Sequence, residues 1–150
     1  MHQSWPSTDG RYIFANNEGP EFGVSVVIVY DCKPFLDAAA NPSSPPVFVR
    51  NWTNGSLAYN HNLYVHNIER PMGSGVFKDY IFESNYNSGL RVFQVDRDDN
   101  LPVSDPNKII LSEIGFYDTY LPNDGPGYEG EWSNFMFCLL YTSPSPRDRS

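Results

Sequence analysis

Short apolar runs alternate with clusters of turn-forming residues along most of the chain. The runs are rich in Val, Ile, Tyr and Phe, and the segments between them are rich in Gly, Asn, Asp and Pro. Because β-branched and aromatic residues favour strands and the others favour turns, this pattern is typical of an all-β sandwich, barrel or propeller. The helix-compatible stretch at 35–40 lies between Pro34 and Pro42, which limit it to one or two turns.

The order of the apolar runs repeats. A strand predicted over 11–17 contains Tyr-Ile-Phe and ends on Asn, and it has a counterpart over 79–85. The next run, 23–31, has a counterpart over 89–96, and both begin with Gly and end with Asp. Self-similarity of this kind indicates repeated structural units.

Each copy continues through a Pro-containing loop into a further apolar strand. This strand is predicted over 47–49 in the first copy and over 109–111, leading into 114–116, in the second. The first two strands are joined by an Asp-Gly turn at 8–10 in the first copy and by a longer insert at 68–78 in the second. Each copy therefore reads as four consecutive antiparallel strands.

Four consecutive antiparallel strands make up one blade of a β-propeller. The run 24–30 is apolar on both faces, which suits a sheet packed between neighbouring blades. We predict an all-β β-propeller fragment of about two four-stranded antiparallel blades, 2–52 and 60–118, plus the start of a third at 130–137. Together they form a partial propeller over 1–137. A β-sandwich is the alternative fold.

Composition and charge narrow the range of partners. The chain has 150 residues and 15% aromatic content, which indicates one globular domain or part of one. The formal net charge of −8 and the scattered basic residues argue against nucleic acid and against an anionic membrane surface. The longest apolar run is also far shorter than the roughly 20 residues of a membrane span.

Several motifs carry a family resemblance when they are taken together. They lie at 2–5, 61–65, 84–92, 115–120 and 123–128, the last of them followed by Trp132-Ser133. Over about residues 2–137 the chain resembles the choice-of-anchor B family, whose LVIVD-type repeats look like β-propeller blades.

The resemblance implies a secreted or cell-surface protein, held by an anchor that varies between members, with no well-established catalytic activity. In that family further blades precede the first motif, and Trp-Ser opens the last blade. A propeller usually closes with four to eight blades. The resemblance therefore implies a C-terminal fragment, whose partners include the missing blades of its own full-length chain.

The β pattern stops at Phe137. Residues 138–148 look like an in-frame translation of a sequencing-library adapter, and we expect 138–150 to be a non-native disordered tail. A short basic interaction tail is the alternative. Without Cys138, Cys32 has no cysteine partner, and we interpret it as a small packed side chain rather than a nucleophile.

His2 and His61 occupy equivalent positions of the repeat. The first strands of propeller blades line the central channel, so both imidazoles are candidates for binding a metal ion or an anion there. The simpler interpretation is that each His ties its strand to a loop by hydrogen bonds. We favour that interpretation, and expect no cofactor, because Trp132 stands at the third equivalent position.

A calcium site is a weaker hypothesis. Asp96, Asp98 and Asn100 have the opening spacing of a calcium loop. Leu101 replaces the required Gly and Asn107 stands where the loop needs Glu, so we interpret this segment as a solvated loop between the third and fourth strands.

Aromatic and acidic residues gather near the C-terminal end of the repeat region. They are Tyr117, Tyr120, Tyr128 and Trp132, with Asp118, Asn123, Asp124 and Glu129 among them. Such a set suits a glycan, which has apolar faces and hydroxylated rims. The simpler interpretation is that the rings fill the gap between two blades.

Motifs for catalysis are missing from the sequence, which has no Gly-rich phosphate loop, zinc-binding pair or G-x-S-x-G elbow. We therefore expect a non-catalytic module for display, adhesion or binding of a surface glycan or protein ligand. The alternative is a propeller hydrolase or metal-dependent enzyme at the channel mouth, with Asp118 and Glu129 as a carboxylate pair. The candidate ligand-binding residues are His2, Trp5, His61, Asn62, Asn85, Arg91, Asp118, Tyr120 and Trp132.

Overall fold

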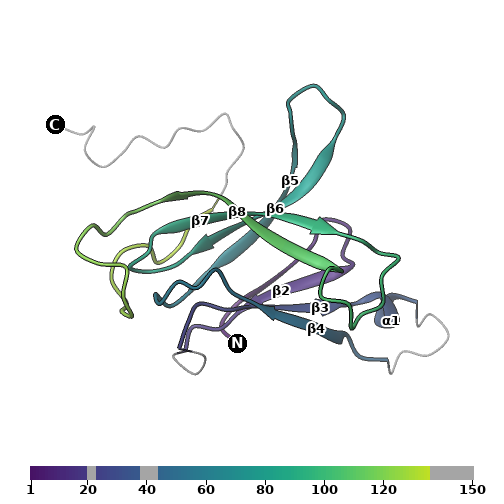
Figure 1. Ribbon diagram of the computed structural model, residues 1–150, viewed down its shortest axis with the longest axis horizontal. Helices are drawn as coiled ribbons and strands as arrows, with labels where there is room; N and C mark the ends of the chain where they lie inside the picture. Colours follow the sequence, from purple (N-terminus) through teal and green to yellow (C-terminus); the bar gives the residue numbers. More distant parts are fainter. Residues whose placement is uncertain (20–22, 38–43, 136–150) are drawn as a thin grey trace.

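The computed structural model describes residues 1–19, 23–37 and 44–135, which form two four-stranded antiparallel sheets (Figure 1). The first sheet has the order β1 (Ser4–Pro6), β2 (Tyr12–Asn16), β3 (Val27–Asp31), β4 (Val47–Trp52). The second has the order β5 (Leu63–Glu69), β6 (Phe77–Ser84), β7 (Leu90–Arg97), β8 (Ile109–Tyr117). The all-β prediction, with four consecutive antiparallel strands in each copy, is confirmed.

The short helix α1 (Lys33–Leu36) follows β3. It begins two residues before the predicted stretch because Pro34 lies in its first turn, where a missing N–H leaves no helical hydrogen bond unmade. Residues 38–43 and 136–150, and with them Cys138 and the predicted tail, lie outside the described residues. In the described ranges, no helix is long and apolar enough to cross a membrane.

Strand β3 begins later than the sequence predicts. Residues 24–26 are apolar enough for a strand, but apart from a long bond of 3.4 Å from Asn17 N to Val26 O, their backbone groups bond to the segment before β5. Ser25 N donates to Ser56 O at 2.8 Å, and the Asn60 side-chain amide donates to Val26 O at 2.9 Å. These bonds hold the two copies together at the start of β3.

Both sheets carry an irregularity at the same place in their topology. Val92 pairs with Gly115 and Phe93 with Glu113, so Ile114 is an extra residue in β8. In the first sheet Val29 pairs with Arg50 and Tyr30 with Phe48, which leaves Val49 as the extra residue in β4. A β-bulge therefore bends the last strand of each copy.

The two sheets lie face to face, with β5–β8 drawn above β2–β4 in Figure 1, and they share one core. Alternate residues of each strand point into it. The first sheet contributes Tyr12, Phe14, Val27 and Val29, and the second contributes Leu63, Val65, Ile81, Phe93, Val95, Ile109 and Leu111. The hairpin between β5 and β6 extends away from this core (Figure 1).

A group of buried charges joins the sheets beside the core. Asp31 accepts hydrogen bonds from Arg11 Nε and Nη2, both at 3.3 Å, and from Lys33 N at 2.8 Å. Lys108 Nζ lies 3.8 Å from the Asp31 carboxylate and donates to Leu101 O at 2.7 Å. The Asp31 and Lys108 side chains are each only 2% exposed, so they are stabilised by each other and by their hydrogen bonds instead of by water.

Candidate functional site

His2, Glu18 and His61 form a cluster of potential ligands at the junction of the two copies. His2 Nδ1 lies 2.9 Å from Glu18 Oε2, and His61 Nε2 lies 3.8 Å from Glu18 Oε1. The two imidazole rings are 4.1 Å apart between centroids. One donor atom from each residue lies within 4.8 Å of the others.

Asn16, at the end of β2, holds both histidine segments in place. Its carbonyl accepts the backbone N–H of His2 at 3.0 Å, while its side-chain amide donates to the carbonyl of His61. His61 N also donates to Ser84 O at 2.8 Å, at the end of β6. Each histidine stands two residues before the first strand of its copy, so the repeat explains why they meet.

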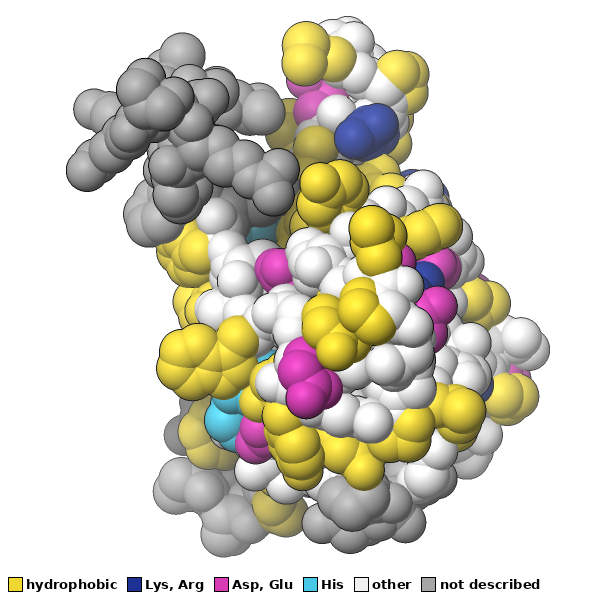
Figure 2. Space-filling model, turned by 90° about the vertical axis from the view of Figure 1, so that its left-hand side faces the viewer, with side chains coloured by type: hydrophobic (Ala, Val, Ile, Leu, Met, Phe, Trp, Pro, Cys, Tyr) yellow, Lys and Arg dark blue, Asp and Glu magenta, His cyan; other side chains and the backbone are white. Residues whose placement is uncertain are grey.

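An aromatic wall surrounds the cluster. Tyr86 OH donates to Glu18 Oε1 at 2.6 Å, and the Tyr86 ring lies 5.2 Å from both His61 and Tyr128. Trp132 lies 5.3 Å from His61. Figure 2 shows histidine side chains at the surface among hydrophobic and acidic ones. His61 is buried, whereas Trp132 is 65% and Tyr128 60% exposed, so the wall presents flat rings to solvent.

The turn that carries Tyr86 has an unusual backbone. Tyr86 adopts a positive φ of 29°, and its carbonyl accepts hydrogen bonds from Gly89 N and Glu131 N, both at 3.0 Å. Gly89 has a φ of +70°, and a Cβ on it would lie 2.3 Å from Tyr117 O. Glycine is therefore required here for both conformation and space.

The environment sets the charge of the ring side chains. Burial lowers the pKa of His61 below its usual value and the nearby His2 lowers it further, while the backbone of Trp132 and the charge of Glu18 oppose this shift. Burial also raises the pKa of Tyr86, and its hydrogen bond to Glu18 adds to that rise. At neutral pH, His61 is therefore an uncharged imidazole with a lone pair, and Tyr86 is a hydrogen-bond donor.

Of the predicted site residues, His2, His61 and Trp132 come together. The others bond or pack elsewhere, although Asn62 and Asn85 lie beside His61 and Tyr86 in sequence. Trp5 packs against Tyr64 at 5.0 Å, the Asn62 amide donates to Ser133 Oγ, and the Asn85 amide donates to Glu83. Arg91 donates to Ser88 O, lies 3.4 Å from Glu113 and covers the Phe116 ring. Asp118 accepts the backbone N–H of Tyr120.

The sequence reasoning missed Glu18, Asn16 and Tyr86. Glu18 and Tyr86 lie in loops, where no hydrophobic period marks a functional position, and they meet across 68 residues of sequence. From the sequence, Asn16 is only the last residue of a repeated strand. Its role follows from contacts between the two copies, which a comparison of the copies with each other does not reveal.

The residues of the calcium hypothesis and of the carboxylate-pair hypothesis have other partners. Asp96 lies in strand β7 instead of a loop, and it pairs with Lys78 at 2.6 Å, while Asp98 bonds to Asn100. The loop interpretation was therefore wrong for Asp96, because the strand extends to Arg97 through its pairing with β8.

The carboxylates of the hydrolase alternative each have a partner of their own. Glu129 lies 3.4 Å from the Asn87 amide, and Asp118 accepts the backbone N–H of Tyr120.

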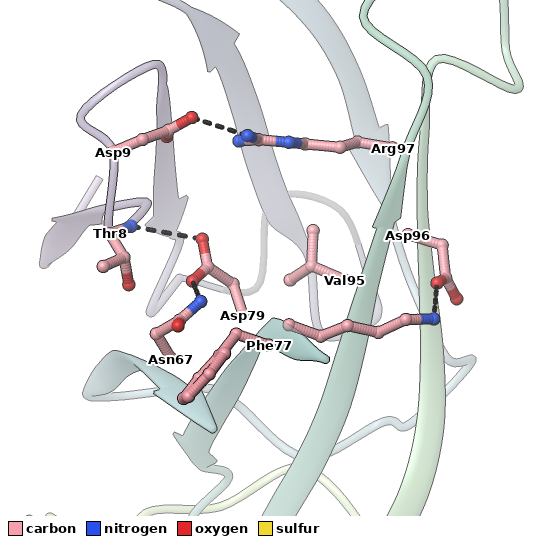
Figure 3. Close-up of a pocket in the computed structure, with 9 residues that line it drawn as sticks. Thr8, Asp9, Asn67, Phe77, Asp79, Val95, Asp96 and Arg97 are labelled. Carbon is pink, nitrogen blue, oxygen red and sulfur yellow. Dashed lines mark hydrogen bonds and ion pairs between the residues drawn. The ribbon is translucent and has the colours of Figure 1, made fainter. Parts of the chain in front are cut away.

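A cavity lies between the turn at 8–10 and the second sheet (Figure 3). It measures about 570 Å³. Its charged side chains already bind one another or the backbone: Arg97 contacts Asp9 at 2.6 Å, and Asp79 accepts hydrogen bonds from Thr8 N and Asn67. We interpret this cavity as a joint between the sheets.

Glu83 is a buried carboxyl group behind the candidate site. It is 1% exposed and accepts hydrogen bonds from the Asn60 and Asn85 amides, both at 2.8 Å. Burial raises its pKa to about 7, although these two bonds oppose the rise. The side-chain oxygens of Asn60 and Asn85 have no hydrogen-bond partner among the described residues.

We expect the stability of the protein to fall as the pH rises from about 4.5 to 7. The folded pKa of Glu83 lies above the unfolded value, so folding takes up a proton in this window and the benefit is lost at higher pH. Glu83→Gln should raise the free energy of unfolding at pH 8 by on the order of 2 kcal/mol and change it little at pH 4. Urea unfolding across this range measures both; equal pH slopes in the two proteins would contradict the assignment.

No protein-family model, curated protein or solved structure matches the chain. The class of protein is defined by its fold and site alone. It is an all-β protein of two consecutive four-stranded sheets, with a histidine–glutamate cluster and exposed aromatic rings where the sheets meet. The chemistry of that junction is the basis for the function proposed below.

Proposed function

We propose that the chain is part of a non-catalytic β-propeller, secreted or displayed at a cell surface, which binds a glycan. The observation that carries this proposal is the pair of exposed rings, Trp132 and Tyr128, beside the His61 and Tyr86 rings. Sugar rings have apolar faces that pack against flat aromatic side chains. Large exposed aromatic side chains gathered at one place are typical of a binding surface.

Polar groups beside the rings suit the hydroxyl rim of a sugar. The Asn87 amide lies 3.3 Å from Asn123 Oδ1 and 3.4 Å from Glu129 Oε2, and Asn87 Oδ1 accepts Glu129 N at 3.3 Å. The Tyr128 ring also lies 5.0 Å from Tyr59. Amide, carboxylate and aromatic groups are thus fixed relative to one another before a ligand arrives, which lowers the cost of binding.

The propeller part of the proposal rests on how the sheets are connected. Each sheet pairs its four strands in sequence order, and the first strands β1 and β5 contact each other, as neighbouring blades do at a central channel. The location at a cell surface, and the missing blades as partners, rest on the resemblance of residues 2–137 to the choice-of-anchor B family. A β-sandwich remains the alternative arrangement of the same two sheets.

We expect Trp132→Ala to weaken glycan binding about tenfold or more, because a stacked ring contributes on the order of 1.4 kcal/mol. A glycan array identifies the ligand, and calorimetry on the best binder measures the loss. Phe77→Ala is a matched control, since Phe77 is an exposed ring (59%) on the cavity between the sheets. It should bind as the unmodified chain does.

Two outcomes would count against this function. If the unmodified chain binds nothing across the array, the aromatic wall is packing surface for a neighbouring blade. If the bound glycan is cleaved during the measurement, the hydrolase alternative is favoured over a binding module.

A further inference from the structure

We propose that His2, Glu18 and His61 bind a divalent first-row transition metal ion such as Zn²⁺. Two histidines and one carboxylate are an established ligand set for zinc, with a fourth position left for water or a ligand. The proposal rests on these three side chains and holds whether or not the neighbouring rings bind a glycan.

The spacing of the donor atoms fits such an ion. With bonds of about 2.0–2.1 Å, neighbouring ligands of a tetrahedral zinc ion lie about 3.3 Å apart. The two measured separations, 2.9 Å from Glu18 to His2 and 3.8 Å from Glu18 to His61, fall on either side of this value. All three donor atoms lie within 4.8 Å of one another, so changes of at most about 1.5 Å in any separation bring the set to the spacing for zinc.

The exposure of the three side chains suits an adjustment of this size. His2 and Glu18 are about a third exposed (33% and 31%), so they can adjust, while the His61 side chain is only 9% exposed and its backbone is bonded to Ser84 and Asn16. One fixed ligand and two adjustable ones can settle around an ion without a change of fold.

His61 has ligand capacity that the protein leaves unused. Its Nδ1 is buried and has no hydrogen-bond partner among the described residues, and its Nε2 lies beyond hydrogen-bond distance from Glu18. The nitrogen that faces the Glu18 carboxylate is therefore Nε2, and this is the atom that would coordinate an ion.

Groups behind the ligands hold them in the way that metal sites require. Tyr86 OH donates to Glu18 Oε1 at 2.6 Å, which orients the carboxylate. Asn16 holds the main chain of both histidines. Imidazole ligands favour zinc, cobalt and related ions, whereas calcium and magnesium prefer ligand sets made of oxygen alone.

The test is a Zn²⁺ titration of the full chain without an affinity tag, treated with EDTA and dialysed. We expect one ion per chain by calorimetry, and a Co²⁺ adduct with the visible absorption of a tetrahedral site. Glu18→Gln and His2→Ala should each weaken Zn²⁺ binding at least about tenfold. His66→Ala is the matched control, because His66 lies against Phe82 and Phe135, and it should bind Zn²⁺ normally.

His61 needs a separate variant because it is buried. His61→Gln, checked for folding by thermal melting, should also lose Zn²⁺ binding. The proposal is overturned if the unmodified chain shows no Zn²⁺ binding up to about 100 μM. It is equally overturned if Glu18→Gln and folded His61→Gln bind as well as the unmodified chain, because the ion then sits on His2 and the N-terminal amine alone.

Discussion

Asp31→Ala is expected to lower the free energy of unfolding by about 3–5 kcal/mol. The substitution removes the carboxylate that pairs with Arg11 and faces Lys108, and it leaves the Lys108 side chain without this partner in a place that water hardly reaches. Removing one partner of a buried ion pair costs far more than removing an exposed one, because the remaining charge stays desolvated. Urea unfolding at pH 7 measures the loss.

Asp37→Ala is the matched control. Asp37 pairs with Lys33 four residues before it, but the two side chains are 61% and 51% exposed. Exposed pairs of this kind contribute about 0.3–0.5 kcal/mol. Equal losses in the two variants would contradict the view that burial makes the Asp31 cluster important.

The same cluster predicts a loss of stability in acid. Burial of Asp31 opposes its charge, but the hydrogen bonds from Arg11 and Lys33 N and the attraction of both cations outweigh it and lower its pKa. The folded pKa lies below the unfolded value, so this contribution is complete above about pH 4 and declines as the pH falls further. Asp31→Ala should therefore reduce the difference in stability between pH 5 and pH 2.

Phe93→Ala is expected to cost about 3–5 kcal/mol of stability. Phe93 is fully buried in the core between the sheets, and its ring lies 4.8 Å from Trp52 of the first sheet. The substitution loses the transfer free energy of the ring and leaves a cavity that β-strands, fixed by their ladders, fill poorly. Thermal and urea unfolding both report it.

Phe116→Ala removes the same ring from an exposed position. Phe116 is 64% exposed and lies under the Arg91 guanidinium at 4.9 Å, so its loss should cost no more than about 1 kcal/mol. If Phe93→Ala costs as little as Phe116→Ala, the two sheets do not share a tightly packed core.

The strands and their order were predictable because they depend on local pattern. The Tyr-Ile-Phe runs in β2 and β6 consist of aromatic and β-branched residues, which favour strands. The start of β3 was not predictable, since Val26 bonds to Asn60 of the next copy and the sequence does not encode that competition locally.

The site was predictable only in part, for the same reason. The repeat places His2 and His61 at equivalent positions, and the sequence reasoning reached both of them. Glu18 joins them from a loop without a pattern, and Tyr86 reaches Glu18 from a turn far along the chain. Contacts across the interface between the copies depend on how the sheets pack against each other, and the periodicity of a single sequence does not reveal that packing.

The consecutive strand order of each sheet also bears on how the chain folds. Each sheet pairs strands that are neighbours in sequence, so its ladders close shorter loops, at lower entropic cost, than most contacts between the sheets do. The bonds between sheets span much more chain: Asn16 reaches His61 across 45 residues, and Tyr12 reaches Asp99 across 87. The order of events favoured by chain entropy is therefore hairpins first and docking of the sheets last, so the histidine cluster is assembled only in the final step of folding.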